Sequence, residues 1–211
     1  MDETLFRIQT PYIDAQTLLG FMSEYQNPRD RIRRLVQKRE LIRLKNGFYL
    51  IAAKIKQGSH TIIPYEQVAN WLYGPSYVSL EWALSFYGMI PERVNAITSM
   101  SLGRDKEYRT PVANFLYYRL NASCYSIGIE QKKAVDVVGG FLLASPEKAL
   151  ADLAFKRCKG FSKTQLKAEL LESRRMDDEH FQKLNKNLLN NIAEAYHSKA
   201  VDHLVNLIGI L

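Results

Sequence analysis

The sequence contains few cysteines and no long apolar run. Its two cysteines, Cys124 and Cys158, do not form a CxxC pair, which argues against a disulfide framework or a cysteine-based zinc site. The most apolar stretch, residues 137–144, is far shorter than the ~20 residues that a membrane-spanning helix requires. The chain begins Met-Asp-Glu-Thr, which lacks the basic and then apolar order of a signal peptide. We therefore expect a soluble, cytoplasmic protein.

Motifs for metal, phosphate or catalytic chemistry are also scarce. Residues 138–140 (VGG) lack the Gly-Lys-Ser/Thr continuation of a phosphate loop. Glu130 and Lys132 form an E-x-K pattern with Asp105 upstream, as in some Mg²⁺-dependent nucleases, but so short a match is common by chance. The four histidines have no partners at metal-ligand spacing: His60, His180, His197 and His203. We expect no cofactor, no metal and no enzymatic activity.

Positive charge is concentrated in one stretch, Asn27 to Lys56. The stretch holds only two acidic residues, Asp30 and Glu40, and carries a net charge of +8, whereas the whole chain carries +7. The remaining residues therefore sum to about zero, which favours a binding surface for a polyanion over general solubility. The alternative to a binding surface is a solvated amphipathic helix beside an ordinary hairpin. The ten basic residues are Arg29, Arg31, Arg33, Arg34, Lys38, Arg39, Arg43, Lys45, Lys54 and Lys56.

The first half of this stretch has the pattern of a helix. Asn27 suits the N-cap and Pro28 the first turn, where its missing N–H would be unpaired in any case. Ile32, Leu35 and Val36 form an apolar stripe with the spacing of a core-facing helix. At ~100° per residue, the opposite face carries Asp30, Arg34, Gln37 and Lys38, flanked by Arg31 and Arg33.

The second half predicts a β-hairpin. Residues 41–44 form one strand, Asn46-Gly47 provides a type I′ turn signal, and residues 48–51 form the returning strand. Residues 1–26 are expected to supply the preceding helix, with Ile13 and Leu18 on its apolar side. A basic helix followed by a basic-tipped hairpin is typical of a winged helix-turn-helix, which predicts double-stranded DNA as the partner.

The predicted DNA contacts fall into two groups. Side chains that point away from the apolar stripe are best placed to reach base edges. Arg can form two hydrogen bonds with guanine, and Gln can form two with adenine. This group is Arg31, Arg33, Arg34, Gln37 and Lys38. Residues flanking the helix or on the hairpin are better placed for phosphates, with the hairpin along the minor groove. This group is Arg29, Arg39, Arg43, Lys45 and Asn46. Basic faces of this size usually work in pairs on repeated half-sites, which favours a homodimer on DNA.

The length and pattern predict two domains, residues 1–57 and 58–211, and an α+β fold. With 211 residues, the chain exceeds the ~60–90 that a winged helix uses. Strand-like segments between 95 and 144 predict a small, mostly antiparallel sheet with helices beside it, and the chain is expected to be helical from about 160 onwards. Ser79 is expected to cap the helix that Gly88 ends, and Ser145-Pro146-Glu147 opens another.

Three segments together resemble the AbiEi family of antitoxins from bacterial type IV toxin–antitoxin systems, which act in phage defence. They are the helix and hairpin within 33–49, the segment YVSLEWALSFYGMIP at 77–91, and ASPEKALADL at 144–153. The resemblance covers most of residues 10–155. Its motif residues in the second domain are Ser79, Gly88, Pro91, Pro146, Glu147, Lys148 and Asp152.

The resemblance implies a two-domain protein whose first domain represses its own operon by binding the promoter. The second domain would counter a partner toxin of the nucleotidyltransferase class, and direct binding of the toxin stays open. The first helical element of the winged helix is short in this sequence. Whether the unit has all three helices of a complete winged helix-turn-helix therefore stays open. Helix capping and an i,i+4 contact between Lys148 and Asp152 would also explain the motif at 145–152 without a functional role.

Two alternatives remain at this stage. The first is a winged-helix transcriptional regulator whose second domain senses a ligand or forms an oligomer, with no toxin. The second is a DNA-processing enzyme that a winged-helix domain targets to its substrate.

Overall fold

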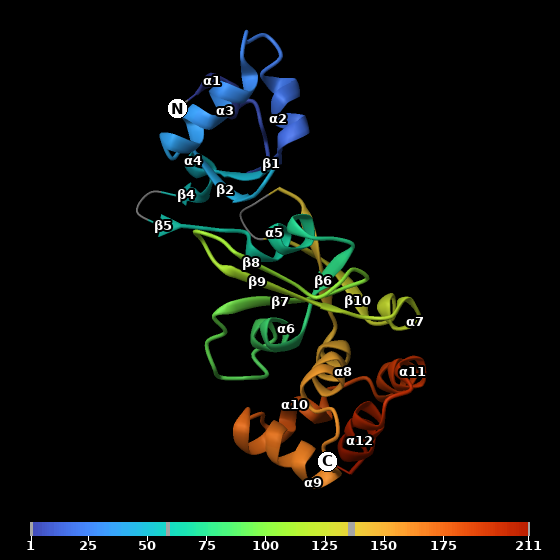
Figure 1. Cartoon of the computed structure of the whole chain (residues 1–211). Coiled ribbons are helices and arrows are strands. Elements are labelled where there is room, and N and C mark those ends of the chain that lie inside the picture. The colour runs from blue at the N-terminus through green and yellow to red at the C-terminus, as the bar shows by residue number, and fades with distance from the viewer. Residues whose placement is uncertain (1, 58–59, 135–137, 211) are drawn as a thin grey trace.

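The N-terminal unit combines short helices with a three-stranded antiparallel sheet of order β1-β3-β2 (Figure 1). The computed structural model describes residues 2–57, 60–134 and 138–210, and the side chains of 56–61 lie outside this description. The elements of this unit are α1 (Glu3–Phe6), β1 (Tyr12–Asp14), α2 (Ala15–Phe21), α3 (Pro28–Gln37), β2 (Leu41–Lys45), β3 (Phe48–Ile51) and α4 (Ala52–Ile55).

The sheet of the N-terminal unit is buried on both faces. Along β3, Tyr49 and Ile51 belong to a small core with α1, α2 and α3, whereas Phe48 and Leu50 belong to the large core of the rest of the chain. This division follows from the alternation of side chains across a strand. The small core of the N-terminal unit and the large core of the rest of the chain therefore pack on opposite faces of this one sheet.

Two expectations for the N-terminal unit are wrong. Residues 1–26 do not form one helix, because Ile13 lies in β1 and pairs with Tyr49 of β3. The hairpin does not use a type I′ turn, which needs positive φ at both central residues. Gly47 alone of the pair has positive φ, at +78°, and the strand register shifts between Arg43 and Lys45.

The second part of the chain is built on a six-stranded sheet of order β10-β11-β6-β7-β9-β8. Pairs β11–β6 and β7–β9 are parallel, and the other three are antiparallel, so the sheet is mixed and the expected antiparallel character holds for three of the five pairings. Its strands are β6 (Ser76–Val78), β7 (Ala96–Ser101), β8 (Lys106–Arg109), β9 (Asn114–Arg119), β10 (Ile129–Lys133) and β11 (Gly140–Ala144). The predicted α+β class is confirmed.

Helices cover both faces of this sheet, as Figure 1 shows. Helix α5 (Tyr65–Leu72) lies on the side that faces the N-terminal unit, and α6 (Leu80–Phe86) and α8 (Pro146–Arg157) lie on the other. A short ribbon of β4 (Lys56–Gln57) and β5 (His60–Thr61) connects the two parts. The remaining helical elements are α7 (Ala122–Tyr125), α9 (Lys163–Ala168), the π-helix Glu169–Ser173, α10 (Asp178–Gln182), α11 (Lys186–Tyr196) and α12 (Lys199–Ile208).

A buried polar cluster joins α8 to the sheet and to α11. The carboxylate of Asp152 accepts hydrogen bonds from the hydroxyls of Tyr77 (2.9 Å), Ser79 (2.6 Å) and Tyr196. The ammonium of Lys148 donates to the Tyr196 hydroxyl (2.8 Å) and to the carbonyl of Cys124. Lys148 and Asp152 are both fully buried. Because an unpaired buried charge is costly, this cluster fixes the position of α8.

We predict that Tyr196→Phe lowers the free energy of unfolding by about 1.5–3 kcal/mol, because it removes hydrogen bonds to two charged groups that stay buried. Tyr125→Phe is the matched control, since the Tyr125 hydroxyl makes no hydrogen bond within the described residues and its loss should change stability little. Chemical denaturation of both variants measures the difference. Equal stability of the two variants would contradict a bridging role for Tyr196.

Candidate nucleic-acid interface

Helix α3 buries the predicted stripe and exposes the opposite face. Ile32 and Leu35 are buried in the small core, and Val36 is partly buried beside them, so the predicted orientation of the helix is confirmed. Pro28 occupies the first turn as expected. Asn27 stands at the N-cap as predicted, although its side chain makes no capping hydrogen bond.

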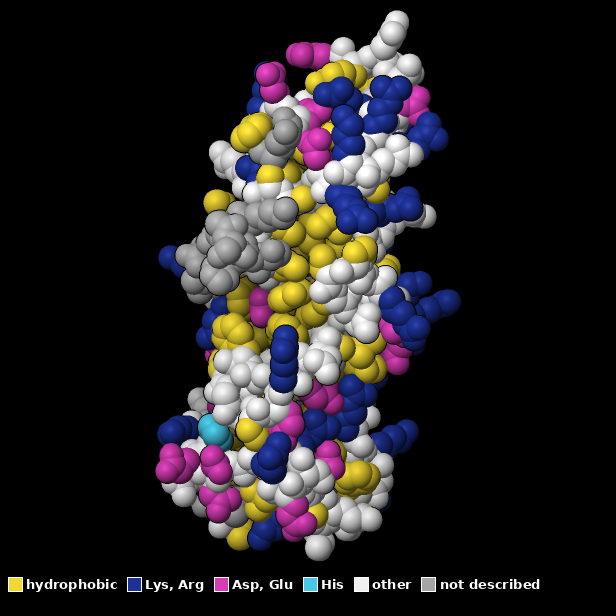
Figure 2. All heavy atoms as spheres, turned by 90° about the vertical axis from the view of Figure 1, so that its left-hand side faces the viewer, with side chains coloured by type: hydrophobic (Ala, Val, Ile, Leu, Met, Phe, Trp, Pro, Cys, Tyr) yellow, Lys and Arg dark blue, Asp and Glu magenta, His cyan; other side chains and the backbone are white. Residues whose placement is uncertain are grey.

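The exposed face of α3 presents several basic and polar side chains. Arg34, Gln37 and Lys38 are exposed and make no side-chain hydrogen bond or ion pair with any described residue. Arg33 is also exposed and pairs with Asp30 at 2.5 Å, a surface contact of low energy that a phosphate or base can replace. Figure 2 shows Lys and Arg side chains on the upper part of the molecule, where this unit lies, with Asp and Glu side chains among them and further Lys and Arg side chains lower down.

Arg31 is not part of this exposed set. Its guanidinium pairs with the buried carboxylate of Asp2 and lies over the Tyr25 ring, 4.5 Å from the ring centroid. Asp2 also caps α1 by accepting from the backbone N–H of Thr4. Burial opposes the ionisation of Asp2, but hydrogen bonds from Thr4 and Arg31 hold its pKa below the ordinary value. Arg31 therefore joins α3 to α1, and the expectation that it reads a base edge is not supported by its position.

The segment after α3 turns sharply into the hairpin. Arg39 has φ of +58°, a left-handed conformation that is unfavourable for a residue with a side chain. The turn is fixed by a hydrogen bond from the N–H of Glu40 to the carbonyl of Leu35 (2.9 Å) and by one from the N–H of Asp2 to the Glu40 carboxylate (2.8 Å). The side chain of Arg39 stays exposed, as does that of Arg29 at the other end of the helix.

The tip of the hairpin is in contact with the second part of the chain. The Lys45 ammonium donates a hydrogen bond to the carbonyl of Leu72 in α5 and lies 5.9 Å from the ring centroid of Tyr108 in β8. Burial lowers its pKa. Lys45 is thus engaged inside the protein, and its predicted phosphate contact is not supported. Arg43 and Asn46 remain exposed on the hairpin.

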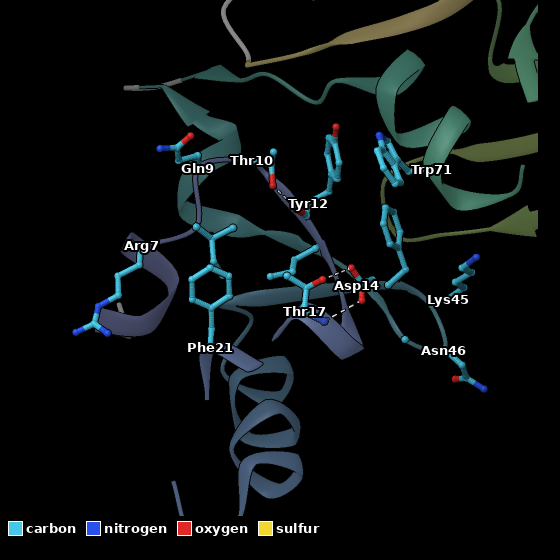
Figure 3. Close-up of a pocket in the computed structure, with 14 residues that line it drawn as sticks. Arg7, Gln9, Thr10, Tyr12, Asp14, Thr17, Phe21, Lys45, Asn46 and Trp71 are labelled. Atoms are coloured by element: carbon cyan, nitrogen blue, oxygen red, sulfur yellow. Dashed lines mark hydrogen bonds between the residues drawn. The ribbon is translucent and has the colours of Figure 1, made fainter. Parts of the chain in front are cut away.

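A groove of about 860 Å³ lies beside the contact between the hairpin and α5 (Figure 3). Tyr12, Phe48 and Trp71 line it and pack against one another, with ring centroids of Tyr12 at 6.0 Å from Phe48 and 6.1 Å from Trp71. Across the groove, α2 contributes Phe21. The Asp14 carboxylate at its edge is already used, because it caps α2 by accepting from Gln16 and Thr17. The aromatic contacts hold α5 against the hairpin.

Part of the second-domain motif defines the ends of helices. Gly88 has φ of +69° directly after α6, where it ends the helix as predicted. Ser145 accepts from the N–H of Lys148 and Pro146 occupies the first turn of α8, so this predicted helix start is confirmed. Pro91 is exposed. Ser79 stands at the N-cap of α6, but its side chain does not cap the helix and instead binds Asp152.

The other motif residues, Glu147, Lys148 and Asp152, are buried and connect α8 to α11 through hydrogen bonds. The Glu147 carboxylate accepts from the Ser145 hydroxyl (2.8 Å) and from the N–H of Asn185 (2.7 Å), which joins α8 to the start of α11. The expected direct contact between Lys148 and Asp152 is replaced by the bridging Tyr196 hydroxyl. Burial lowers the pKa of Lys148 and raises that of Asp152. None of the three offers a surface to a partner.

The residues of the nuclease-like pattern lie far apart in the fold. Glu130 is on β10 and pairs with Lys132 at 2.5 Å, whereas Asp105 precedes β8 and accepts from the N–H of Arg119 (2.6 Å). Strands β10 and β8 are the opposite edges of the six-stranded sheet. Within 2–57, 60–134 and 138–210, no three His, Cys, Asp or Glu residues are grouped to hold a metal ion. The side chain of His60 and the segment 135–137 lie outside the described residues.

Comparisons with known proteins add no family. No protein-family model matches the chain, and no curated protein matches it. None of the helices in the described part of the chain has the length and apolar character needed to cross a bilayer.

Sequence reasoning missed the partners of Arg31 and Lys45. The Asp2 carboxylate pairs with the Arg31 guanidinium, which lies over the Tyr25 ring. The Leu72 carbonyl accepts a hydrogen bond from Lys45. Asp2 carried a recognisable signal, because Asp followed by Glu in the next position is typical of a helix start. The contact with Leu72 had no local signal.

We predict that Arg31→Ala lowers the stability of the chain by about 1–2 kcal/mol, because it removes a charge-assisted hydrogen bond from a buried carboxylate. Since the pKa of folded Asp2 is lowered, the lost contribution exists above its ordinary value of 3.8 and disappears as the pH falls below it. Thermal unfolding of both proteins across this range should show the difference shrinking towards acid. A constant difference would contradict the ion pair.

Proposed function

We propose that the chain is a DNA-binding transcriptional autorepressor and the antitoxin of a type IV, AbiE-like toxin–antitoxin system. The observation that carries the DNA-binding half is the exposed face of α3, with Arg34, Gln37 and Lys38 unpaired within the described residues. The order of helix, strand, two helices and a hairpin supports a winged helix-turn-helix with a short first helix. This protein would act on DNA in the cytoplasm without a cofactor.

In this proposal α3 lies in the major groove of the operator. Its ten residues span about 15 Å, which suits the contact of one helix face with a few base pairs. Arg34 would fork onto guanine and Gln37 onto adenine, while Arg33 and Lys38 reach neighbouring base edges or phosphates. Arg29, Arg39, Arg43 and Asn46 are exposed around the helix and suit phosphate contacts. Paired copies would bind repeated half-sites.

The antitoxin half rests on the resemblance of three segments to the AbiEi family. Of its motif in the second domain, Glu147, Lys148 and Asp152 are buried, so these residues would act by maintaining the fold of that domain. A toxin of the nucleotidyltransferase class would be countered either by direct contact with the surface of the domain or without a stable complex.

We predict that Arg34→Ala weakens specific binding to the DNA upstream of the gene by about 1–3 kcal/mol, because a bidentate base contact is lost. Binding to a shuffled duplex should change less. Lys163→Ala is the charge-matched control, since this exposed lysine opens α9, outside the proposed interface. Fluorescence anisotropy with both duplexes measures the effects. Equal losses on both DNAs would contradict base reading by Arg34.

For the antitoxin half, we predict that co-expression of the chain restores growth to cells that produce the nucleotidyltransferase-like protein encoded beside it. The Arg34→Ala variant should also restore growth when expressed from an unrelated promoter, because neutralisation is assigned to the second domain. Colony counts with and without induction measure the rescue. Tight promoter binding without rescue would leave a plain transcriptional regulator.

A further inference from the structure

Helix α3 contains one acidic residue, Asp30, and its side chain is exposed. Asp30 lies on the same line along the helix as Arg34 and Gln37, because spacings of four and three residues bring side chains onto one face. Arg34 and Gln37 are the residues proposed to read guanine and adenine. A carboxylate on such a face is repelled by the phosphates of any duplex. General attraction to a polyanion therefore does not explain why an acid stands at this position.

The contacts of Asp30 in the free protein leave part of its carboxylate unused. Its Oδ1 atom accepts a hydrogen bond from the Arg33 guanidinium at 2.5 Å, whereas Oδ2 makes no hydrogen bond or ion pair with any described residue. The side chain is 51% exposed. Because a carboxylate has about four acceptor sites, Asp30 can accept from a base while it keeps its bond to Arg33.

The start of α3 offers a purely structural explanation for the same residue. Asp30 is the third residue of the helix, and negative charge in the first turn interacts favourably with the helix dipole. Its carboxylate bonds to Arg33, however, and not to the backbone at the start of the helix. A dipole interaction does not depend on which bases α3 contacts. The two roles therefore differ in one measurable property, the base preference of the protein.

The four bases offer different groups to a carboxylate in the major groove. Cytosine presents an amino donor, adenine presents an amino donor beside the N7 acceptor, and guanine and thymine present acceptors. Because an ionised carboxylate only accepts hydrogen bonds, cytosine suits it best. From Asp30 to Gln37 the helix rises by about 10 Å, which corresponds to about three base-pair steps of ~3.4 Å.

We infer that Asp30 is a specificity-determining residue that selects cytosine at one position of the operator half-site, within about three base pairs of the adenine that Gln37 contacts. The Oδ2 atom accepts a hydrogen bond from the N4 amino group of the cytosine. Arg33 keeps its bond to Oδ1 and so holds the carboxylate in place. This role rests on the proposed function, because it requires α3 to lie in the major groove.

The test is selection of bound duplexes from a pool of random sequence, followed by sequencing, with the full chain and its variants. The parent should enrich a site with one position at which cytosine is preferred about ten-fold over the other bases. Asp30→Asn should lose this preference and favour adenine at the same position about ten-fold, because an Asn amide can bond to both N6 and N7 of adenine. The other positions of the site should stay unchanged. Titration of duplexes that differ only at this position measures the preference directly.

Glu24→Gln is the matched control. Glu24 is exposed in the turn before α3, and its side chain makes no hydrogen bond or ion pair with any described residue. Glu24→Gln and Asp30→Asn each remove one negative charge from the N-terminal unit, so both should bind a shuffled duplex more tightly than the parent does. Only Asp30→Asn should change a base preference.

Three results would overturn the assignment of Asp30. If Asp30→Asn selects the same site as the parent, Asp30 acts only at the start of the helix, and α3 still reads DNA. If the position that depends on residue 30 holds guanine or thymine in the parent site, the carboxylate does not contact that base. If the parent enriches no site at all, base reading by α3 is contradicted, and the proposed function fails together with the role of Asp30.

Discussion

The architecture depends on one constraint, the burial of the three-stranded sheet on both of its faces. Tyr49 and Ile51 of β3 pack under the helices of the N-terminal unit, and Phe48 and Leu50 pack against the second part of the chain. Because neighbouring residues of one strand serve two cores, neither side can shift without disturbing the other. The helix proposed to read DNA is therefore held in a fixed orientation relative to the six-stranded sheet.

This constraint divides the basic residues of the N-terminal unit into two kinds. Arg31 and Lys45 bind groups inside the protein, Asp2 in one case and the Leu72 carbonyl in the other. Arg34, Gln37 and Lys38 are left facing solvent on α3. Positive charge concentrated without matching acids raises repulsion in the free protein, which binding to a polyanion relieves. The division therefore favours the exposed face of α3 as the functional surface.

Local patterns predicted the elements whose determinants lie close together in sequence. The stripe of Ile32 and Leu35 gave the orientation of α3, and Ser145-Pro146 gave the start of α8. Residues 48–51 are all apolar, which is typical of a strand buried on both faces, but the prediction of a DNA-contacting hairpin did not use this signal. Among the strand-like segments expected between 95 and 144, residues 125–128 are instead the end of α7 followed by a turn in which Gly128 adopts φ of +76°, and β10 begins only at Ile129.

Contacts between residues that are far apart in the sequence could not be predicted from local patterns. The spacing of Lys148 and Asp152 suggested a simple contact along one helix, whereas Tyr196, which bridges them, comes from a helix 44 residues after Asp152. The pairing of Arg31 with Asp2 spans 29 residues. Such contacts arise from the packing of whole elements, so a single sequence gives the residue types without their partners.

The most direct measurement is the affinity of the intact chain for the DNA upstream of its own gene, compared with a shuffled duplex of equal composition, over a range of salt concentrations. If α3 presents a DNA-reading face, the native sequence binds more tightly at every salt concentration, and both affinities fall linearly on a double-logarithmic plot as counterions are released. Equal affinity for the two duplexes, or binding that salt does not weaken, would contradict the account.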